Sequence, residues 1–400
     1  MPVNYKYILD LLGKQLQVLN MTLQSSGTIQ FSQIETEFGQ ISGTGNRKIG
    51  GYRISETIGG LIDLPIDAGV PQPGSPISFS DFYSKRCNIV VDCYTSDENR
   101  VEARNKYDAN DLQVVGPGTK TPPAAGTGTK ILIHVNKNIG SQAVSGGSQS
   151  YCALRTGTWD SETDAEGCLL QVDVGASGTI SGAGGDGGSS TECASMDPRH
   201  GEKGNSALGI QHNPTTVNVM SGGLISCGYG GGGAGGSSRN CDEGCREGEG
   251  GAGGGGAGIP AGSAGAGPGG NTGSPGTGGW KADDGSTPTG AQTDGGNGGA
   301  GSWNDHWWEA WAGVGGAGGP GGYYRYTSPG GYALQDPGDY EEVSGPENGY
   351  TAPGKNNTGC SASGGTAGAD GAAIRRVSGY TVNINNSGTI DGSQSATEVL

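Results

Sequence analysis

The chain of 400 residues is short of the side chains that build a large apolar core. Only 32% of its residues are hydrophobic, and four are phenylalanine. We find no apolar run close to the roughly 20 residues that a membrane-spanning helix needs, so we expect no membrane insertion. Residues 1–20 show no basic stretch followed by a clean apolar one, so we also expect no secretory signal.

Basic residues are scarce as well. The 23 Lys and Arg stand against 39 Asp and Glu, which gives a formal net charge of -16. This balance argues against nonspecific binding to a phosphate backbone, so we expect no nucleic-acid partner. The nine cysteines are irregularly spaced, and one C-x-x-x-C pair, Cys241 with Cys245, is a weak zinc signal. We expect no metal site and no cofactor.

Catalytic motifs are missing too. None of the four histidines has a Ser or Cys nearby in a nucleophile motif. The abundant carboxylates leave a pair for glycoside hydrolysis open. A polysaccharide depolymerase normally has a long regular β-helix, however, and we find no such repeat. We therefore predict no catalytic residues and no enzymatic activity.

Glycine is what the chain has in excess. Of its 85 glycines, 52 lie between residues 171 and 330, and this shift in composition suggests four parts. They are an N-terminal module at 1–86, a small β-rich domain at 87–174, a glycine-rich domain at 175–330, and a loop-rich C-terminal segment at 331–400.

The N-terminal part predicts short helices. Apolar residues recur at nearly helical spacing over 5–23. In 31–39, Ser32 and Glu35 have the spacing of a capping box, and Gly39 stands where a helix would end. Residues 77–83 place a Ser before aromatic residues in the same way. In the next part, 88–94 and 130–135 are predicted strands.

A short repeat recurs along the chain. It reads apolar-x-apolar, then a turn ending in Gly, then a short apolar return. Copies lie at 172–181, 217–226 and 382–391, with a looser one at 21–30. Their uneven spacing argues against a simple solenoid and for β-turn units interleaved with glycine-rich excursions.

The glycine-rich excursions allow three structures. Collagen needs Gly at every third residue, and that register is broken here. A flexible linker fits the composition but not the returning strands. Extended polyglycine-II helices, whose backbones bond to neighbouring chains, need Gly wherever chains touch. The predicted fold is mainly β and irregular, with short N-terminal helices and polyglycine-II layers interleaved with strands and turns.

The N-terminal segments 29–39 (IQFSQIETEFG) and 77–83 (ISFSDFY) resemble a paired motif of tailed-bacteriophage virion proteins. The run 178–188 (GTISGAGGDGG) resembles a signature of glycine-rich phage tail proteins. The resemblance implies a tail fibre or tail-tip protein of the virion tail, assembled in the host cytoplasm. Its implied partners are other phage tail proteins, further copies in a homo-oligomer such as a trimer, and a host surface glycan or outer-membrane protein. A purely architectural virion protein, a fibre connector or baseplate subunit, is the alternative.

Aromatic residues gather late in the glycine-rich part. Trp and Tyr are enriched at binding hot spots, and here they stand beside polar residues that can bond to sugar hydroxyls. The receptor-binding candidates are Trp280, Trp303, Asn304, Asp305, His306, Trp307, Trp308, Trp311, Tyr323, Tyr324 and Tyr326. The competing interpretation is that these rings form a local hydrophobic plug or a subunit contact.

A second set of aromatic and aliphatic residues lies in the paired N-terminal motif. Phe31, Ile34 and Phe38 fall on one face of the expected helix. Together with those of the second segment they are expected to be buried against a partner or a sister chain. The virion-docking candidates are Phe31, Ile34, Phe38, Phe79, Phe82 and Tyr83.

Overall fold

The computed structural model confirms a mainly β fold. It describes residues 23–38, 48–52, 74–93, 98–108, 113–114, 130–142, 148–159, 169–189, 200–234, 238–240, 246–248, 253–263, 265–266, 359–361 and 366–399. Within these ranges most elements are strands in parallel sheets, and two short α-helices are present.

Three sheets of parallel strands form the main body. The first contains, in spatial order, β17 (Val382–Asn386), β11 (Thr215–Val219), β8 (Leu169–Val174), β5 (Lys130–Val135) and β1 (Ile89–Cys93), with antiparallel β4 (Gln113–Val114) at its edge. The second contains β18 (Thr389–Asp391), β12 (Leu224–Ser226), β9 (Thr179–Ser181), β6 (Asn138–Gly140) and β2 (Glu98–Asn99). The third contains β19 (Ala396–Thr397), β16 (Ile374–Arg376), β10 (Ser206–Ile210), β7 (Cys152–Arg155) and β3 (Val101–Glu102).

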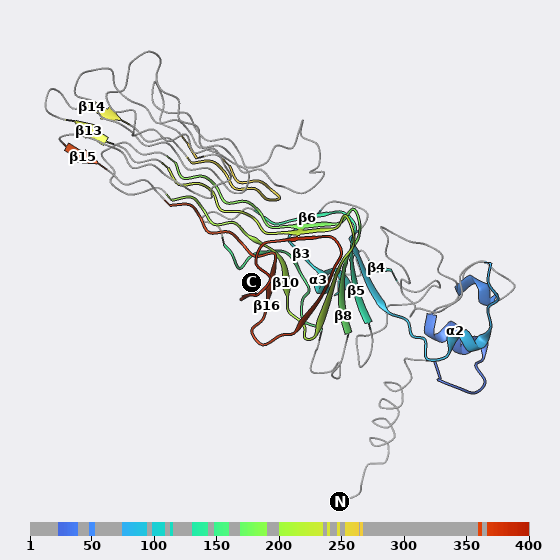
Figure 1. Cartoon of the computed structure of the whole chain (residues 1–400). Coiled ribbons are helices and arrows are strands. Elements are labelled where there is room, and N and C mark those ends of the chain that lie inside the picture. The colour runs from blue at the N-terminus through green and yellow to red at the C-terminus, as the bar shows by residue number, and fades with distance from the viewer. Residues whose placement is uncertain are drawn as a thin grey trace, which may run out of the picture.

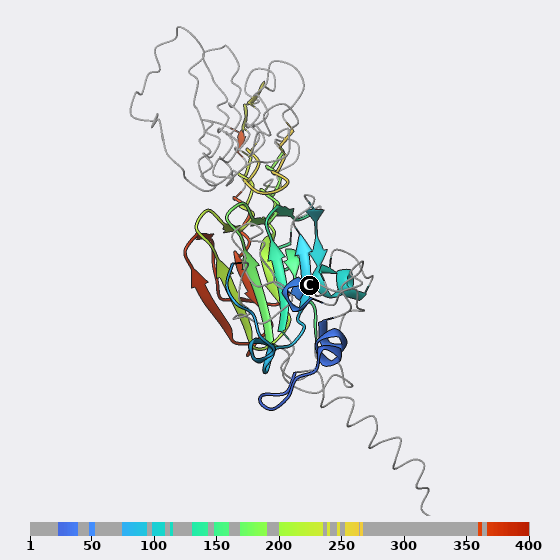
Figure 2. The ribbon, with the colours of Figure 1, turned by 90° about the vertical axis from the view of Figure 1, so that its right-hand side faces the viewer.

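The chain visits these sheets in a fixed rotation. The first, second and third sheets each receive one strand in turn, and this happens five times. The main body is therefore a parallel β-helix of five coils, whose stacked strands are seen side by side in Figures 1 and 2. Inward residues in register, such as Ile133, Val172 and Val217, form its core.

The sequence repeat corresponds to coils of this β-helix. Copies 172–181, 217–226 and 382–391 supply the first and second strands of the third, fourth and fifth coils. The sequence argued against a simple solenoid, and the structure shows a solenoid whose coils are interrupted by insertions. The spacing of the copies is uneven because glycine-rich segments are inserted into the coils. The fourth copy, 21–30, is no coil: its residues 23–30 form no strand, and Leu23 and Ile29 are buried in a separate N-terminal cluster.

The sheets also cross the boundaries suggested by composition. Residue 174 ends β8, and the same coil continues through β9 at 179–181 and β10 at 206–210. Segment 331–400 provides β16 and also β17, β18 and β19, which are the outermost strands of the three sheets at one end. Parallel pairing needs a crossover between partners, so residues far apart in sequence share one core.

The two glycine-rich insertions leave from one corner, between the second and third sheets. Coil three inserts 182–205 there, and coil four inserts 227–373. The described insertion segments run out from the β-helix, and Figure 1 shows them leading to a small antiparallel sheet at the far end. That sheet contains β14 (Arg246–Gly248), β13 (Ser238–Asn240) and β15 (Gly359–Ser361).

The first coil is covered by the segment that follows it. Helix α3 (Ala103–Asp108) packs beside β1 and β3, and β4 pairs antiparallel with β1. The Tyr107 ring lies 5.4 Å from the Trp159 ring, centroid to centroid, and Trp159 is fully buried in the core.

The N-terminal module holds α2 (Phe31–Phe38) and two 3-10 helices, η1 (Ile49–Tyr52) and η2 (Phe79–Phe82). The predicted helix before Gly39 is confirmed, but its expected Ser32–Glu35 cap is wrong because the helix begins at Phe31, before Ser32. The Gln33 side-chain oxygen accepts the Gln30 N–H at 2.7 Å instead. Before η2, the Asp81 carboxylate accepts the Ser78 N–H in the same way, at 2.7 Å. The predicted helix over 5–23 lies outside the described residues, apart from Leu23.

Candidate functional site

Glycine-rich runs leave the β-helix side by side and are hydrogen-bonded to one another at every third residue. Gly182, Gly185 and Gly188 donate their N–H groups to the carbonyls of Ser226, Tyr229 and Gly232, at 2.8 to 3.0 Å. Gly253, Gly256 and Ile259 donate in turn to Gly188, Gly185 and Gly182, each at 2.8 Å. The bonds of one run thus go to several neighbours, because the direction of the N–H rotates along the chain.

One run lies at the centre of this group. Residues 227–234 are buried along their whole length. They are hydrogen-bonded to four other runs, namely 182–188, 200–205, 253–259 and 366–371. We call these five runs and their continuation to Ala266 the glycine bundle. Its backbone groups find their partners in each other, as buried N–H and C=O groups must.

The runs approach too closely for side chains. A Cβ atom on Gly228 would lie 1.9 Å from the carbonyl oxygen of Ala183, and one on Gly256 would lie 1.9 Å from that of Tyr229. On Gly368 the distance to the Glu202 oxygen would be 1.8 Å. Such contacts fall far inside the van der Waals limit, so the close packing depends on glycine at these positions.

The outer runs turn one residue in three to solvent. His200 and Lys203 are exposed on one run, and Thr366 and Ala369 on its neighbour. Pro260, Ser263 and Ala266 are exposed on a third run. The bundle therefore offers regularly spaced outward positions on a backbone scaffold.

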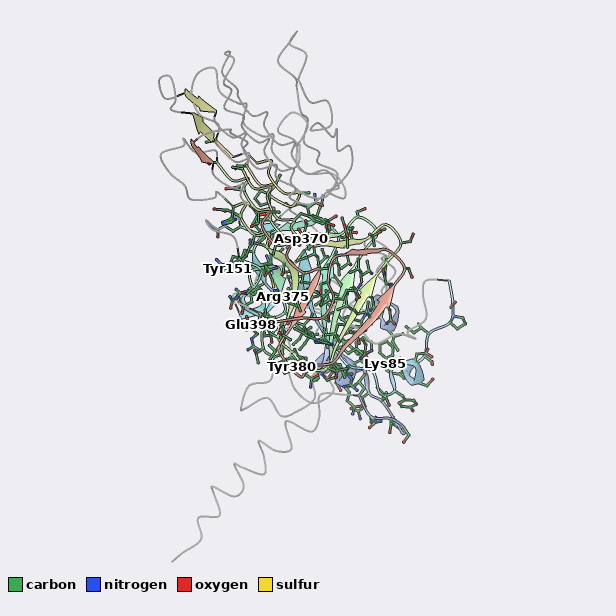
Figure 3. All side chains as sticks on the ribbon, turned by 60° about the vertical axis from the view of Figure 1, so that its left-hand side comes forward. Lys85, Tyr151, Asp370, Arg375, Tyr380 and Glu398 are labelled. Carbon is green, nitrogen blue, oxygen red and sulfur yellow. The ribbon has the colours of Figure 1, made fainter. Side chains whose placement is uncertain are left out.

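Polar side chains tie the bundle to the β-helix. Asn205 is buried and donates from its amide to Ser141 Oγ at 3.0 Å and to the Gln142 carbonyl at 2.8 Å. The Tyr229 hydroxyl donates to the Asp391 carboxylate at 2.6 Å, which joins the central run to β18. The residues after β19 are held by Arg375, whose buried guanidinium donates to the carbonyl of Glu398 at 3.0 Å (Figure 3).

Burial shifts the acid–base behaviour of this junction. Desolvation raises the pKa of the Cys227 thiol to about 12, and the charges of Asp370 and Asp391 add to the effect. Desolvation, then the hydrogen bond to Asp391, raises the pKa of the Tyr229 hydroxyl. The pKa of Asp370 is raised by burial, although its carboxylate accepts the Gly230 N–H at 2.9 Å. Burial thus favours the neutral form of all three groups.

All eleven receptor-binding candidates, from Trp280 to Tyr326, lie outside the described residues. The chain on either side of them is described. Before them, Ala266 donates its N–H to Ser189 Oγ at 3.1 Å on the glycine bundle. After them, Gly359 pairs with Asn240 of β13 in the distal sheet. The segment 267–358 is therefore joined at both ends to elements of the insertions rather than to the coils.

The six docking candidates divide into two groups. Ile34, Phe38 and Phe82 are fully buried within their own module, with the Phe38 and Phe82 rings 6.1 Å apart. They are thus not buried against a partner, as the sequence suggested, because the two motif segments pack on each other. Phe79 remains 41% exposed, and Phe31, 6.4 Å from it ring to ring, is half-buried. Tyr83, also half-buried, donates to the Gly27 carbonyl.

Sequence reasoning missed a polar ladder across the first sheet. His134 Nε2 lies 3.1 Å from Asp173 Oδ2, and both side chains are buried. Asp173 accepts from the Asn218 amide at 2.6 Å, and Asn218 accepts from Asn385 at 2.8 Å. These residues are in register in four consecutive coils. The x of the apolar-x-apolar repeat marks Asp173 and Asn218, but in the last copy it marks Asn383, whereas the register places Asn385 beside Asn218.

No group of His, Cys, Asp and Glu in the described part of the chain is arranged to hold a metal ion. Among the same residues, no helix has the length and apolar character required to span a membrane. The side chains of Cys87, Cys93, Cys152 and Cys227 are buried. Comparison with known proteins identifies no relative: no protein-family model, curated protein or solved structure matches the chain.

Proposed function

We propose that the glycine bundle consists of packed polyglycine-II helices and serves as a rigid support for a binding segment. The observation that carries this proposal is the three-residue period of the hydrogen bonds between runs, because a polyglycine-II helix has three residues per turn and no internal bonds. The close approach of the runs at Gly228, Gly256 and Gly368 supports it, since only glycine fits there.

The protein so built is a bacteriophage tail fibre or tail-tip protein that contributes to host receptor binding. Segment 267–358, which carries the Trp and Tyr candidates, is the proposed receptor contact, and its attachment to the bundle and the distal sheet favours this role. Binding residues concentrate on loops that a rigid scaffold positions. A host glycan or outer-membrane protein is the proposed ligand, and other tail proteins are the proposed partners of the N-terminal module.

Adsorption tests this function. Purified protein should compete with phage for host cells, and the double variant Trp307→Ala with Trp308→Ala should lose this competition while keeping its thermal midpoint. A buried interface Trp is worth about 2 kcal/mol or more, which corresponds to roughly thirty-fold in affinity. A variant that blocks adsorption as well as the parent does would remove these rings from the receptor contact.

An architectural virion protein is the second candidate. The bundle itself favours it, because a backbone lattice is also a good spacer. This role predicts that the purified protein does not compete for host cells, and that the Trp307→Ala and Trp308→Ala changes lower protein yield in particles instead of adsorption.

A further inference from the structure

The two ends of the β-helix differ. The first coil is covered by α3 and by β4, which pairs with β1. At the other end, β17, β18 and β19 are the outermost strands of their sheets among the residues that the structure describes. Solenoids need a cap at each terminus to hide the stacking surface. Among the described residues no strand pairs with the outer side of β17, β18 or β19, and we call this end of the β-helix the open end.

The backbone of β17 presents hydrogen-bonding groups at this end. Thr215 donates its N–H to the Thr381 carbonyl at 3.1 Å, and the Ser387 N–H donates to the Val219 carbonyl at 2.7 Å. Odd-numbered residues of this stretch thus face β11. Because backbone groups alternate sides along a strand, those of Val382, Ile384 and Asn386 point to the outer edge.

The side chains at this end do not protect it. β17 reads VNINN, without a charge or a proline, although natural edge strands are usually blocked by one or the other. Val382, Ile384 and Ile390 pack against the core but are only partly buried. The single charged residue in β17, β18 and β19 is Asp391, which accepts the Tyr229 hydroxyl.

We propose that the open end pairs with the open end of a second copy of this chain across a two-fold axis. β17 then lies antiparallel to β17 of the second copy, centred on Ile384, and the two Ile384 residues exchange both backbone bonds. Val382 faces Asn386 of the second copy, and Asn383 faces Asn385. This register uses every outward backbone group of the strand.

A second copy is favoured over other occupants by charge and by the geometry of the ends. Each chain carries a net charge of -16, so two copies repel across most surfaces, whereas β17 and β19 carry no charge. The covered first coil blocks head-to-tail growth, so the assembly closes as a dimer. The inference does not depend on the proposed phage function.

The mass of the full chain in solution tests the pairing. Sedimentation or light scattering should give about twice the chain mass of 39.9 kDa. Asn383 and Asn385 are exposed, so the double variant N383K/N385K should fold, as circular dichroism can check, and be monomeric. N383D/N385D should be monomeric as well. An equimolar mixture of the two should regain the dimer, because each Lys then faces an Asp.

A matched control places two lysines on the same outer face, but in the inner coils, as Gln171→Lys with Thr216→Lys. These residues are adjacent in register on β8 and β11, and this variant should remain a dimer. The proposal is overturned if the unmodified chain is monomeric at its highest soluble concentration. It is equally overturned if an oligomer persists in both charged edge variants, since the contact would then lie elsewhere.

Discussion

Glycine allows the runs of the glycine bundle to pack closely. It also allows close stacking at the corner between the first and second sheets of the β-helix. In the third coil, four residues separate Val174 from Thr179, whereas two separate Asn386 from Thr389 in the last coil. A Cβ on Gly178 would lie 2.2 Å from the Val135 oxygen of the second coil, where only two residues separate Val135 from Asn138, so the longer corner of the third coil stacks on this short one only with glycine there. Val172 therefore aligns with Ile384, not with Val382 as the gap-free repeat suggests.

The dependence of the bundle on glycine can be tested at single positions. Gly256→Ala places a methyl group where the Tyr229 oxygen stands, so we expect a loss of roughly 1–3 kcal/mol in the free energy of unfolding, as for other overpacked sites. Ser263→Ala, at an exposed position of a neighbouring run, should change little. Thermal or urea unfolding of both variants measures the difference, and equal midpoints would speak against close-packed runs.

The raised pKa of Asp370 predicts that the free energy of unfolding depends on pH. Burial raises its pKa in the folded state above 3.8, so the folded state holds the proton more tightly than the unfolded state. Stability is therefore lost as the pH rises from about 3.8 through the folded pKa, and it stays lost at neutral pH. Asp370→Asn keeps an oxygen for the Gly230 N–H and should be more stable than the parent at pH 7, with the advantage shrinking toward pH 3. Urea unfolding across this range checks the trend, and an Asn variant that is less stable at neutral pH would contradict it.

Among the elements, local pattern predicted some and missed others. The strands 89–93 and 130–135 and helix 31–38 follow from alternation and helical spacing. Their assembly into coils could not be predicted, because insertions such as 227–373 separate strands that pair side by side. The burial of Ile34, Phe38 and Phe82 was misjudged for a related reason: two short motifs 40 or more residues apart complete each other's core. Of the candidate site, the glycine runs were predicted, but the candidate Trp and Tyr residues remain a prediction.

Two phenylalanines of the N-terminal module, buried Phe82 and exposed Phe79, separate a role in stability from a role in docking. Phe82→Ala removes a fully buried ring and should cost about 3–5 kcal/mol of module stability. Phe79→Ala removes a ring that is 41% exposed, so it should leave the thermal midpoint nearly unchanged while lowering incorporation into particles. Unfolding curves and particle content, measured together, separate the two effects. Normal incorporation of the Phe79 variant would place the docking contact on other residues.

The chain combines two parts that are stabilised in different ways. The five-coil β-helix is held by an apolar core, whereas the bundle is held by backbone hydrogen bonds between runs and has almost no side chains to bury. The insertions leave and return at one corner of the coils, so the β-helix fixes where each run begins and ends. The bundle has to be rigid for the proposed function, because the proposed receptor segment can be positioned only if its support is ordered.

Amide hydrogen exchange of the intact protein tests whether the glycine bundle is rigid. The N–H groups of Gly185, Gly228, Gly231 and Gly256 are bonded between runs and should exchange slowly, at rates close to those of the core strands. Peptides covering 182–188, 227–234 and 253–259 report them by mass spectrometry. Protection of the glycine peptides at the level of β8 and β11 is the predicted result. Exchange of these peptides at the rate of an unstructured chain would contradict an ordered glycine bundle.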